Sequence, residues 1–250
     1  MRLINLQILI AALLLHSCTI PSGNSDDELY GMIGLSGGGV ITNVAVSPVD
    51  DQIISLATNM SGVFFTYDGP KQWEMLDQSV LRYGRVKPCF HPSEPGTVYA
   101  INGGRLIISW DSSKTWKSIG NIDYIDGPVA IHSDMPELML CSSGNRIWQS
   151  LDAGENWQET AGPTGRVIDF LFRSGEDLSA VDCYAALTTG IYFSGDAGET
   201  WAELSEGLPD KPIRAFAGGF GSGDRGVLYC LAGNDFYRMM TETGRWEYVT

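Results

Sequence analysis

Residues 194 to 201 read SGDAGETW, and other octets in the chain align with this stretch on its tryptophan. They are SWDSSKTW at 109–116, SLDAGENW at 150–157 and a weaker TYDGPKQW at 66–73, while MMTETGRW at 239–246 keeps only the tryptophan. The five tryptophans stand at positions 73, 116, 157, 201 and 246, so successive copies are 43, 41, 44 and 45 residues apart. A repeat of that length predicts a propeller or a solenoid.

The residues around each octet favour the propeller. Every repeat begins with a run of alternating apolar residues, followed by a turn and a second run. A third run leads into the octet, and a short fourth run follows it. In the fourth repeat these four runs are RVIDFLF, DCYAALT, IYFSG and WAEL. Period-two alternation with aromatic enrichment and Gly/Asp/Asn turns is typical of strands. Four antiparallel strands per repeat are typical of a propeller blade. We therefore expect an all-β chain with blades at about 38–77, 85–120, 127–160, 165–206 and 212–250, forming either a five-bladed ring or the front part of a larger one.

The octet itself fits a hairpin between the third and fourth strands. Its Asp can accept hydrogen bonds from nearby backbone amides, its Gly supplies a positive φ, and its Trp can bury its ring between blades. A calcium site of the EF-hand type is disfavoured because no Glu follows at the twelfth position. The residues assigned to this structural role are Thr66, Asp68, Trp73, Ser109, Asp111, Trp116, Ser150, Asp152, Trp157, Ser194, Asp196, Gly198 and Trp201, with calcium binding or catalysis by the Asp residues as the alternative.

The first eighteen residues predict export. Arg2 is followed by an apolar run from about Ile8 to Leu15, which is too short to span a bilayer and fits a signal peptide. The ending Leu-His-Ser-Cys resembles a bacterial lipoprotein processing site, with Cys18 as the lipidated residue. Residues 19–31 then form a polar tether and residues 32–250 the propeller. We expect a cell-envelope lipoprotein, with simple cleavage and secretion as the alternative.

Charge and cysteine usage exclude several kinds of partner. Of 16 basic and 30 acidic residues, only Arg2 lies in the signal, so the mature chain stays strongly acidic. Such a charge disfavours nucleic acid, and leaves the lipid anchor as the means of membrane attachment. The cysteine spacing fits neither a zinc site nor a redox pair, and no metal or cofactor is expected.

The octet Ser-x-Asp-x-Gly-x-Thr-Trp resembles the Asp-box, or BNR repeat, and the resemblance covers nearly the whole mature chain. Proteins with this motif include sialidases, xyloglucan-cleaving glycoside hydrolases, the sortilin ectodomain and a photosystem II assembly factor. In these families the box lies on the face away from the active centre. The resemblance implies a propeller fold strongly and a particular function weakly.

The first repeat is similar to the start of the xyloglucanase-type propellers, with GGGVITNVAVSPVDDQIISLATNMSGVFF running from residue 37 to residue 65. In that family an Asp in a Thr-Asp-x-Gly-Gly segment is the general base of an inverting hydrolysis, which needs two carboxylates. The matching position here is Asn59, which cannot take a proton from water, and the family's acid lies in a second propeller that this chain lacks. A glycan-binding cleft could be retained without that mechanism. The early Arg-Ile-Pro signature of sialidases is absent.

Arginines mark the expected ligand face. Arg85, Arg166 and Arg214 each open the first strand of a repeat, while Arg105 and Arg146 lie in or just after the turn between strands two and three. Together with Asn59 they are the candidate ligand-binding residues, because a positive mouth would attract a carboxylated or sulfated glycan. Alternatively, each arginine pairs with a nearby carboxylate, such as the candidate acid/base residues Asp123, Asp126 or Asp235.

Other polar residues suit structural roles. His91 and His132 occupy the same turn position in consecutive repeats, and Cys141 and Cys230 the same position in the second strand, as small buried hydrophobic residues would. The chain is thus predicted to bind or process extracellular polysaccharide, in particular an anionic one. A glycoside hydrolase-like activity stays open, and a protein-interaction or assembly propeller is the alternative.

Overall fold

The structure is a computed structural model that describes residues 40–59, 62–69, 71–77, 79–81, 88–175, 177–221 and 225–249. The signal peptide, Cys18, the polar tether and Arg85 therefore lie outside the described residues. No helix within the described ranges is long and apolar enough to cross a membrane.

Each of the five repeats forms one antiparallel four-stranded sheet with its strands in chain order. Sheet 1 contains β1 (Ile41–Val46), β2 (Ile54–Thr58), β3 (Val63–Thr66) and β4 (Glu74–Met75). Sheet 2 contains β5 (Cys89–Phe90), β6 (Val98–Asn102), β7 (Arg105–Ser109) and β8 (Lys117–Ser118). Sheet 3 contains β9 (Val129–Ile131), β10 (Met139–Ser143), β11 (Arg146–Ser150) and β12 (Gln158–Glu159).

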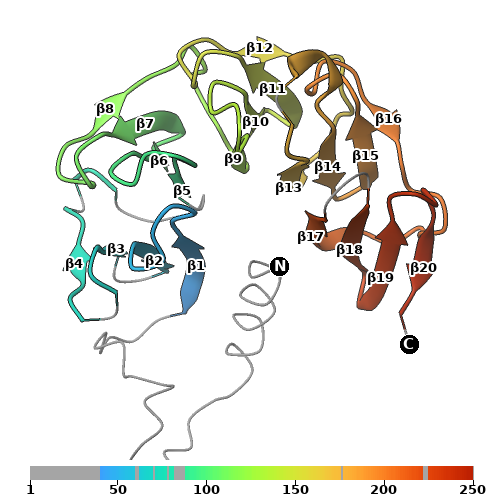
Figure 1. Ribbon diagram of the computed structural model, residues 1–250, viewed down its shortest axis with the longest axis horizontal. Coiled ribbons are helices and arrows are strands. Elements are labelled where there is room, and N and C mark those ends of the chain that lie inside the picture. The colour runs from blue at the N-terminus through green and yellow to red at the C-terminus, as the bar shows by residue number, and fades with distance from the viewer. Residues whose placement is uncertain are drawn as a thin grey trace, which may run out of the picture.

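Sheet 4 contains β13 (Val167–Phe172), β14 (Cys183–Leu187), β15 (Gly190–Ser194) and β16 (Ala202–Glu203), with a short 3-10 helix, η1 (Leu178–Ala180), between its first two strands. Sheet 5 contains β17 (Ile213–Phe220), β18 (Gly226–Ala232), β19 (Asp235–Met240) and β20 (Trp246–Tyr248). Figure 1 shows the sheets following one another around a central axis, with the first strand of each sheet innermost and the fourth outermost. The predicted β-propeller of four-stranded blades is confirmed.

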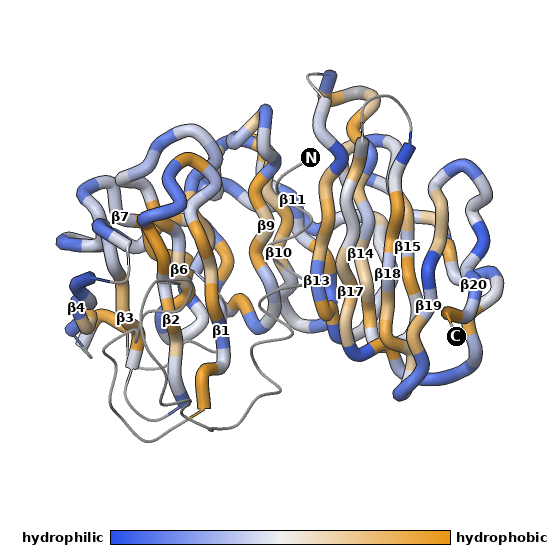
Figure 2. Tube along the Cα trace, turned by 60° about the horizontal axis from the view of Figure 1, so that its bottom comes forward, coloured by the Kyte–Doolittle hydropathy of each residue, from blue (hydrophilic) through white to orange (hydrophobic). Residues whose placement is uncertain are grey.

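The hydrophobic core is divided among the spaces between successive blades. Each of four clusters joins one blade to the next: Phe65 packs with Phe90 between sheets 1 and 2, and Ile108 with Cys141 between sheets 2 and 3. Leu140 packs with Ala185 between sheets 3 and 4. Figure 2 shows the corresponding apolar segments along the strands of every sheet. Because both faces of an internal sheet are covered in this way, the strands read as strongly apolar.

The strand order gives every sheet two distinct ends. At one end, called here the mouth, the first strand begins and the second strand turns into the third, as at Asn102–Arg105 and Ser143–Arg146. At the other end, the box rim, the third strand passes through the Asp-box into the fourth. An antiparallel meander places these two features at opposite ends of the sheet. The boxes therefore lie on the far side of the blades from the mouth.

The Asp-box hairpin of sheet 4 shows what the repeated residues do. Asp196 accepts hydrogen bonds from the backbone amide of Thr200 (2.9 Å) and from the hydroxyl of Ser194 (2.7 Å). The Ser194 hydroxyl in turn accepts the amide of Gly198 (2.8 Å), and the indole of Trp201 donates to the Gly198 carbonyl (2.9 Å). The same bonds recur around Asp152. The structural interpretation of the octet is thereby supported in atomic detail.

The copies differ in completeness. In sheet 1 the hydroxyl of Thr66 donates to Asp68 (3.1 Å), but the indole nitrogen of Trp73 is buried without a hydrogen-bond partner among the described residues. In sheet 5 the indole of Trp246 donates instead to the carbonyl of Leu204 in the preceding blade (2.8 Å). The weak first copy and the last copy of the octet thus keep the tryptophan but lack some of the hydrogen bonds of the Asp-box turn.

The structure also explains the histidines. The Nδ1 atom of His132 accepts the amides of Asp134 (3.2 Å) and Met135 (3.1 Å), while Nε2 lies 3.1 Å from the carbonyl oxygen of Arg173 in the next blade. Nδ1 must be unprotonated to accept and Nε2 protonated to donate, so the ring is neutral. Burial lowers the pKa of His132, consistent with that form. His91 accepts the amides of Ser93 and Glu94 in the same way, so both are turn residues.

The Asp-box carboxylates predict acid sensitivity. The side-chain hydroxyl and the amide of Thr115 lower the pKa of Asp111 from 3.8 to about 2. Because the folded-state pKa lies below the unfolded value, this stabilisation is complete above about pH 4 and is lost as the pH falls toward 2. We expect the thermal unfolding midpoint to fall across that window. Asp111→Asn should lower the midpoint at pH 7 and flatten its acid dependence, whereas an unchanged acid slope would contradict this role.

A second prediction concerns the turn glycine of the fourth box. Gly198 has φ +96°, and an added Cβ would lie 2.9 Å from Cδ2 of Leu140 in the neighbouring blade. A left-handed conformation costs a non-glycine residue about 1–2 kcal/mol, and the contact adds to this. Gly198→Ala should therefore lower the free energy of unfolding by at least about 1 kcal/mol in denaturant titrations. Gly175→Ala, where no atom lies within 4 Å of the added Cβ, is the matched control and should change it little.

Candidate functional site

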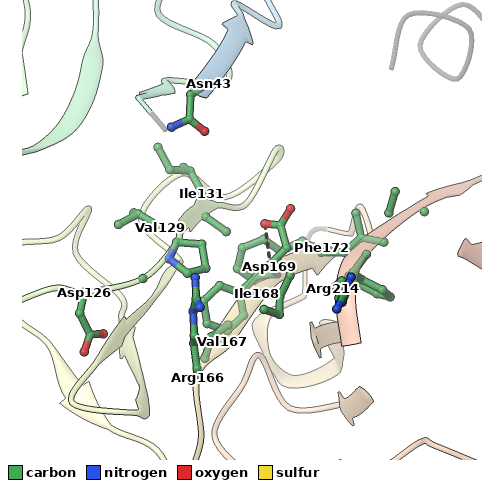
Figure 3. A pocket seen from close by; sticks show the side chains of 18 of the residues that line it. Asn43, Asp126, Val129, Ile131, Arg166, Val167, Ile168, Asp169, Phe172 and Arg214 are labelled. Carbon is green, nitrogen blue, oxygen red and sulfur yellow. Dashed lines mark hydrogen bonds between the residues drawn. The ribbon is translucent and has the colours of Figure 1, made fainter. Parts of the chain in front are cut away.

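A cavity of about 750 Å³ lies among the innermost strands. Strands β9, β13 and β17 supply most of its lining, and Asn43 of β1 reaches it from across the axis. The polar side chains that line it include Asp126, Arg166, Asp169 and Arg214, and Figure 3 shows them with the apolar residues Ile131 and Phe172. The centre of the propeller thus combines charged groups of both signs with apolar walls, as ligand pockets commonly do.

The predicted arginines divide into two groups. Arg105 forms an ion pair with Asp123 (3.4 Å), and Arg146 with Glu159 (2.8 Å). Neither lines the cavity, so the local carboxylate pairing considered from sequence holds for these two, with Glu159 as an unanticipated partner. Arg85 lies outside the described residues.

Arg166 and Arg214 differ from every other described arginine. The remaining ones, Arg105, Arg146, Arg173, Arg225, Arg238 and Arg245, each form an ion pair. No ion pair joins Arg166 or Arg214 to a carboxylate within the described ranges, and Arg214 donates only to the amide oxygen of Asn234 (3.2 Å). Both residues are exposed and both line the same cavity. Two guanidinium groups without an ion pair among the described residues therefore line this cavity, together with the carboxylates of Asp126 and Asp169.

Local irregularities in the inner strands direct side chains into this cavity. The pairing of first and second strands shifts register between Ile41 and Asn43 in sheet 1, between Val167 and Asp169 in sheet 4, and between Ile213 and Ala215 in sheet 5. Such a bulge re-aims the neighbouring side chains. In each case a cavity-lining polar residue, Asn43, Asp169 or Arg214, lies at the bulge or directly beside it.

Asn43 and Asp169 line the cavity but were not predicted from the sequence. A signal was present, because each is a polar residue inside an apolar inner strand, in ITNVAV and VIDFLF. Asp169 accepts the amide of Phe170 (3.0 Å). A polar side chain in such a strand either interrupts the alternating apolar pattern or faces a central channel. The β-bulges determine which of the two occurs, and residue types alone do not reveal where the bulges lie.

The candidate acid/base residues do not gather at one place. Asp126 lines the cavity and accepts the Ser142 hydroxyl (3.3 Å) and the Gly144 amide (3.2 Å). Asp123 is almost fully exposed beside Arg105, and Asp235 accepts Lys211 Nζ (2.6 Å). Asp126 is thus the member of the predicted set that faces the cavity, where Asp169 joins it.

Asn59 has a structural partner at the mouth. Its side-chain oxygen accepts a hydrogen bond from the backbone amide of Val40 (2.9 Å), and the backbone amide of Asn59 donates to the Val40 carbonyl oxygen (3.1 Å). These bonds tie the turn after β2 to the start of β1. Asn59 is exposed and is not part of the cavity lining.

The described residues contain no group of three His, Cys, Asp or Glu side chains arranged to hold a metal ion. Cys89, Cys141, Cys183 and Cys230 are free thiols. Burial raises the pKa values of Cys141 and Cys183, and that of Cys230 to about 12, so these three are predominantly protonated at neutral pH. Cys141 and Cys230 behave as the small buried hydrophobic residues predicted from their positions, and Cys183 of β14 is buried in the same way.

Comparison with known proteins shows the fold. No protein-family model and no curated protein matches the chain. Among solved structures, the GH74 xyloglucanase from Xanthomonas campestris superimposes with a TM-score of 0.67 at 19% identity, over 87% of this chain and 38% of that one. An ancestral GH74 enzyme gives 0.67 at 17% identity, over 85% and 31%. YCF48 bound to D1 peptide gives 0.58 at 15% identity, over 84% and 68%.

The chain spans about a third of the length of these GH74 enzymes and about two thirds of that YCF48 chain. At such low identities the likeness concerns the architecture alone. The chain is therefore a β-propeller structurally similar to GH74 xyloglucanases and to YCF48, in agreement with the Asp-box resemblance of its sequence.

Proposed function

We propose that the protein binds an extended anionic polymer, an extracellular polysaccharide carrying carboxylate or sulfate groups, in the central cavity. The observation that carries the proposal is that Arg166 and Arg214 line this cavity without a described carboxylate partner, whereas every other described arginine is ion-paired. A guanidinium group binds a carboxylate or sulfate through two parallel hydrogen bonds.

The negative charge of the rest of the chain favours binding of an anionic polymer at this cavity over binding elsewhere on the surface. The chain carries a formal net charge of −14, so an anionic polymer is repelled from most of the surface. At the cavity, Arg166 precedes β13 and Arg214 lies in β17, which belong to neighbouring blades. A polymer crossing the cavity can therefore meet both guanidinium groups, while Ile131 and Phe172 offer apolar contact to sugar rings.

The comparisons support a polymer ligand in general terms. The Xanthomonas campestris protein is a xyloglucanase, which acts on a polysaccharide, and the YCF48 structure holds a peptide. The peptide complex favours a second candidate for this chain, in which the cavity binds an acidic peptide segment of a protein partner. Both candidates use the same chemistry, carboxylates on a chain, and differ in the backbone that carries them.

Ligand affinity tests the proposal. Polygalacturonate should bind the full chain more tightly than the neutral polysaccharide xyloglucan, with affinity falling as salt rises. Arg166→Ala and Arg214→Ala should each weaken polygalacturonate binding at least about tenfold, since a hydrogen bond to a charged group contributes about 1.5–3 kcal/mol. Arg105→Ala and Arg146→Ala are the controls, because their ion pairs lie outside the cavity lining. Isothermal titration calorimetry measures all four variants.

Two outcomes would change the account. If polygalacturonate and xyloglucan bind equally, or if the control variants weaken binding as much as the cavity variants, the arginine site is wrong. If poly-glutamate peptide binds through Arg166 and Arg214 while no polysaccharide does, the second candidate replaces the first.

The location of the protein is part of the same proposal. We propose that the chain is exported and held at the cell envelope by a lipid on Cys18, supported by the leader sequence MRLINLQILIAALLLHSC. Cys18→Ala should move the protein, expressed in a bacterial host, from the membrane fraction to the soluble exported fraction in immunoblots. A wild-type chain already in the soluble exported fraction, with the variant partitioning in the same way, would favour simple cleavage and secretion, and a variant that stays in the membrane fraction would contradict anchoring through Cys18.

A further inference from the structure

Charged side chains of both signs line the central cavity, and they come from three successive blades. Asp126 lies just before β9 of sheet 3, Arg166 lies just before β13 of sheet 4, Asp169 lies within β13, and Arg214 lies in β17 of sheet 5. In chain order, which is also the order of these blades around the axis, the signs alternate. In the view of Figure 3, Asp126 lies on one side of Arg166, and Asp169 lies on the other side, toward Arg214.

The carboxylate of Asp126 keeps its negative charge available to the cavity. Its side chain is exposed, and no ion pair joins it to a cation among the described residues. Its hydrogen bonds come from neutral donors, the Ser142 hydroxyl (3.3 Å) and the Gly144 amide (3.2 Å). A carboxylate can accept about four hydrogen bonds, so Asp126 has acceptor capacity left for a ligand. The cavity therefore presents this carboxylate as well as the guanidinium groups of Arg166 and Arg214.

This mixture of charges discriminates among anionic polymers. A polymer that carries only negative groups is attracted by Arg166 and Arg214 but repelled by Asp126 and Asp169, and placing like charges near one another is costly. An ammonium group on the polymer turns the repulsion at Asp126 into attraction. A site that combines attraction for one ligand with repulsion of a related one is selective between them.

We propose that the cavity selects a polysaccharide that carries ammonium groups beside its carboxylates, as a polymer of amino-sugar and uronic-acid units would. The arginines bind the carboxylates, and Asp126 binds an ammonium group. The proposal rests on the polysaccharide binding proposed above and names the class of polysaccharide that the site takes.

A chemically matched pair of polymers tests this selection. Carboxymethyl chitosan carries amines and carboxylates, whereas its N-acetylated form keeps the carboxylates and loses the charge of the amines. Calorimetry of the full chain, at a pH at which the amines are protonated, compares the two. The amine-bearing form should bind at least about tenfold more tightly, the effect expected of one hydrogen bond between charged groups.

Asp126→Asn tests whether this preference comes from the cavity. The variant should weaken binding of the amine-bearing form at least about tenfold, whereas binding of the N-acetylated form should strengthen because a repulsive charge is lost. Asp123→Asn is the matched control. It removes the same charge from the same connection between sheets 2 and 3, but Asp123 does not line the cavity, so the preference should persist. Circular dichroism checks that both variants keep their sheets.

The outcomes separate this inference from the function on which it rests. Equal binding of the two polymers would overturn the selection, and so would an Asp126→Asn variant that weakens both polymers equally or an Asp123→Asn variant that weakens the amine-bearing form as much. If Arg166→Ala still weakens binding of both polymers in those cases, the arginine site itself stands. Binding of both polymers that does not change in Arg166→Ala or Arg214→Ala would overturn the proposed function and this inference together.

Discussion

The packing of each four-stranded sheet against the next is the interaction on which the remainder of the structure depends. A single sheet of this kind has apolar residues on both faces and cannot bury them by itself, so each blade is stabilised by its neighbours. Phe65 of sheet 1, Leu106 of sheet 2 and Ile191 of sheet 4 are almost fully buried only because another blade lies over them. The Asp-box contributes to the same interfaces, since Gly198 lies against Leu140 of the preceding blade.

This arrangement separates stability from binding in space. The box rim carries the Asp-box hairpins and the neutral His132, whose hydrogen bonds are all used to hold turns and to join blades. The innermost strands and the residues beside them instead carry polar groups that line the cavity and do not hold the blades together. Arg166 is the clearest case, because it lines the central cavity and has no described carboxylate partner in a chain with nearly twice as many acidic as basic residues. The propeller can therefore vary its ligand chemistry at the centre without disturbing the hairpins that hold its blades.

Much of the fold could be predicted from the sequence because its strongest signals are local. The octet ending at Trp201 contains every group that its hairpin uses, and its spacing from Trp157 gives the blade length. The cavity was less predictable, because its lining depends on pairing between strands. Arg146 and Arg166 were both candidate ligand-binding residues from the sequence, but Glu159 on the neighbouring strand β12 neutralises Arg146. Asp169 was overlooked because a register shift in β13 determines where the side chains beside it point.

Chemical footprinting of the arginines tests the central claim most directly. Treatment of the folded chain with phenylglyoxal, followed by peptide mass spectrometry with and without polygalacturonate, reports which guanidinium groups the polymer covers. The account predicts that Arg166 and Arg214 react readily in the free protein and are protected by the polymer, while the modification of Arg105 and Arg225 is unchanged. Protection of Arg105 and Arg225 without protection of Arg166 and Arg214 would contradict it.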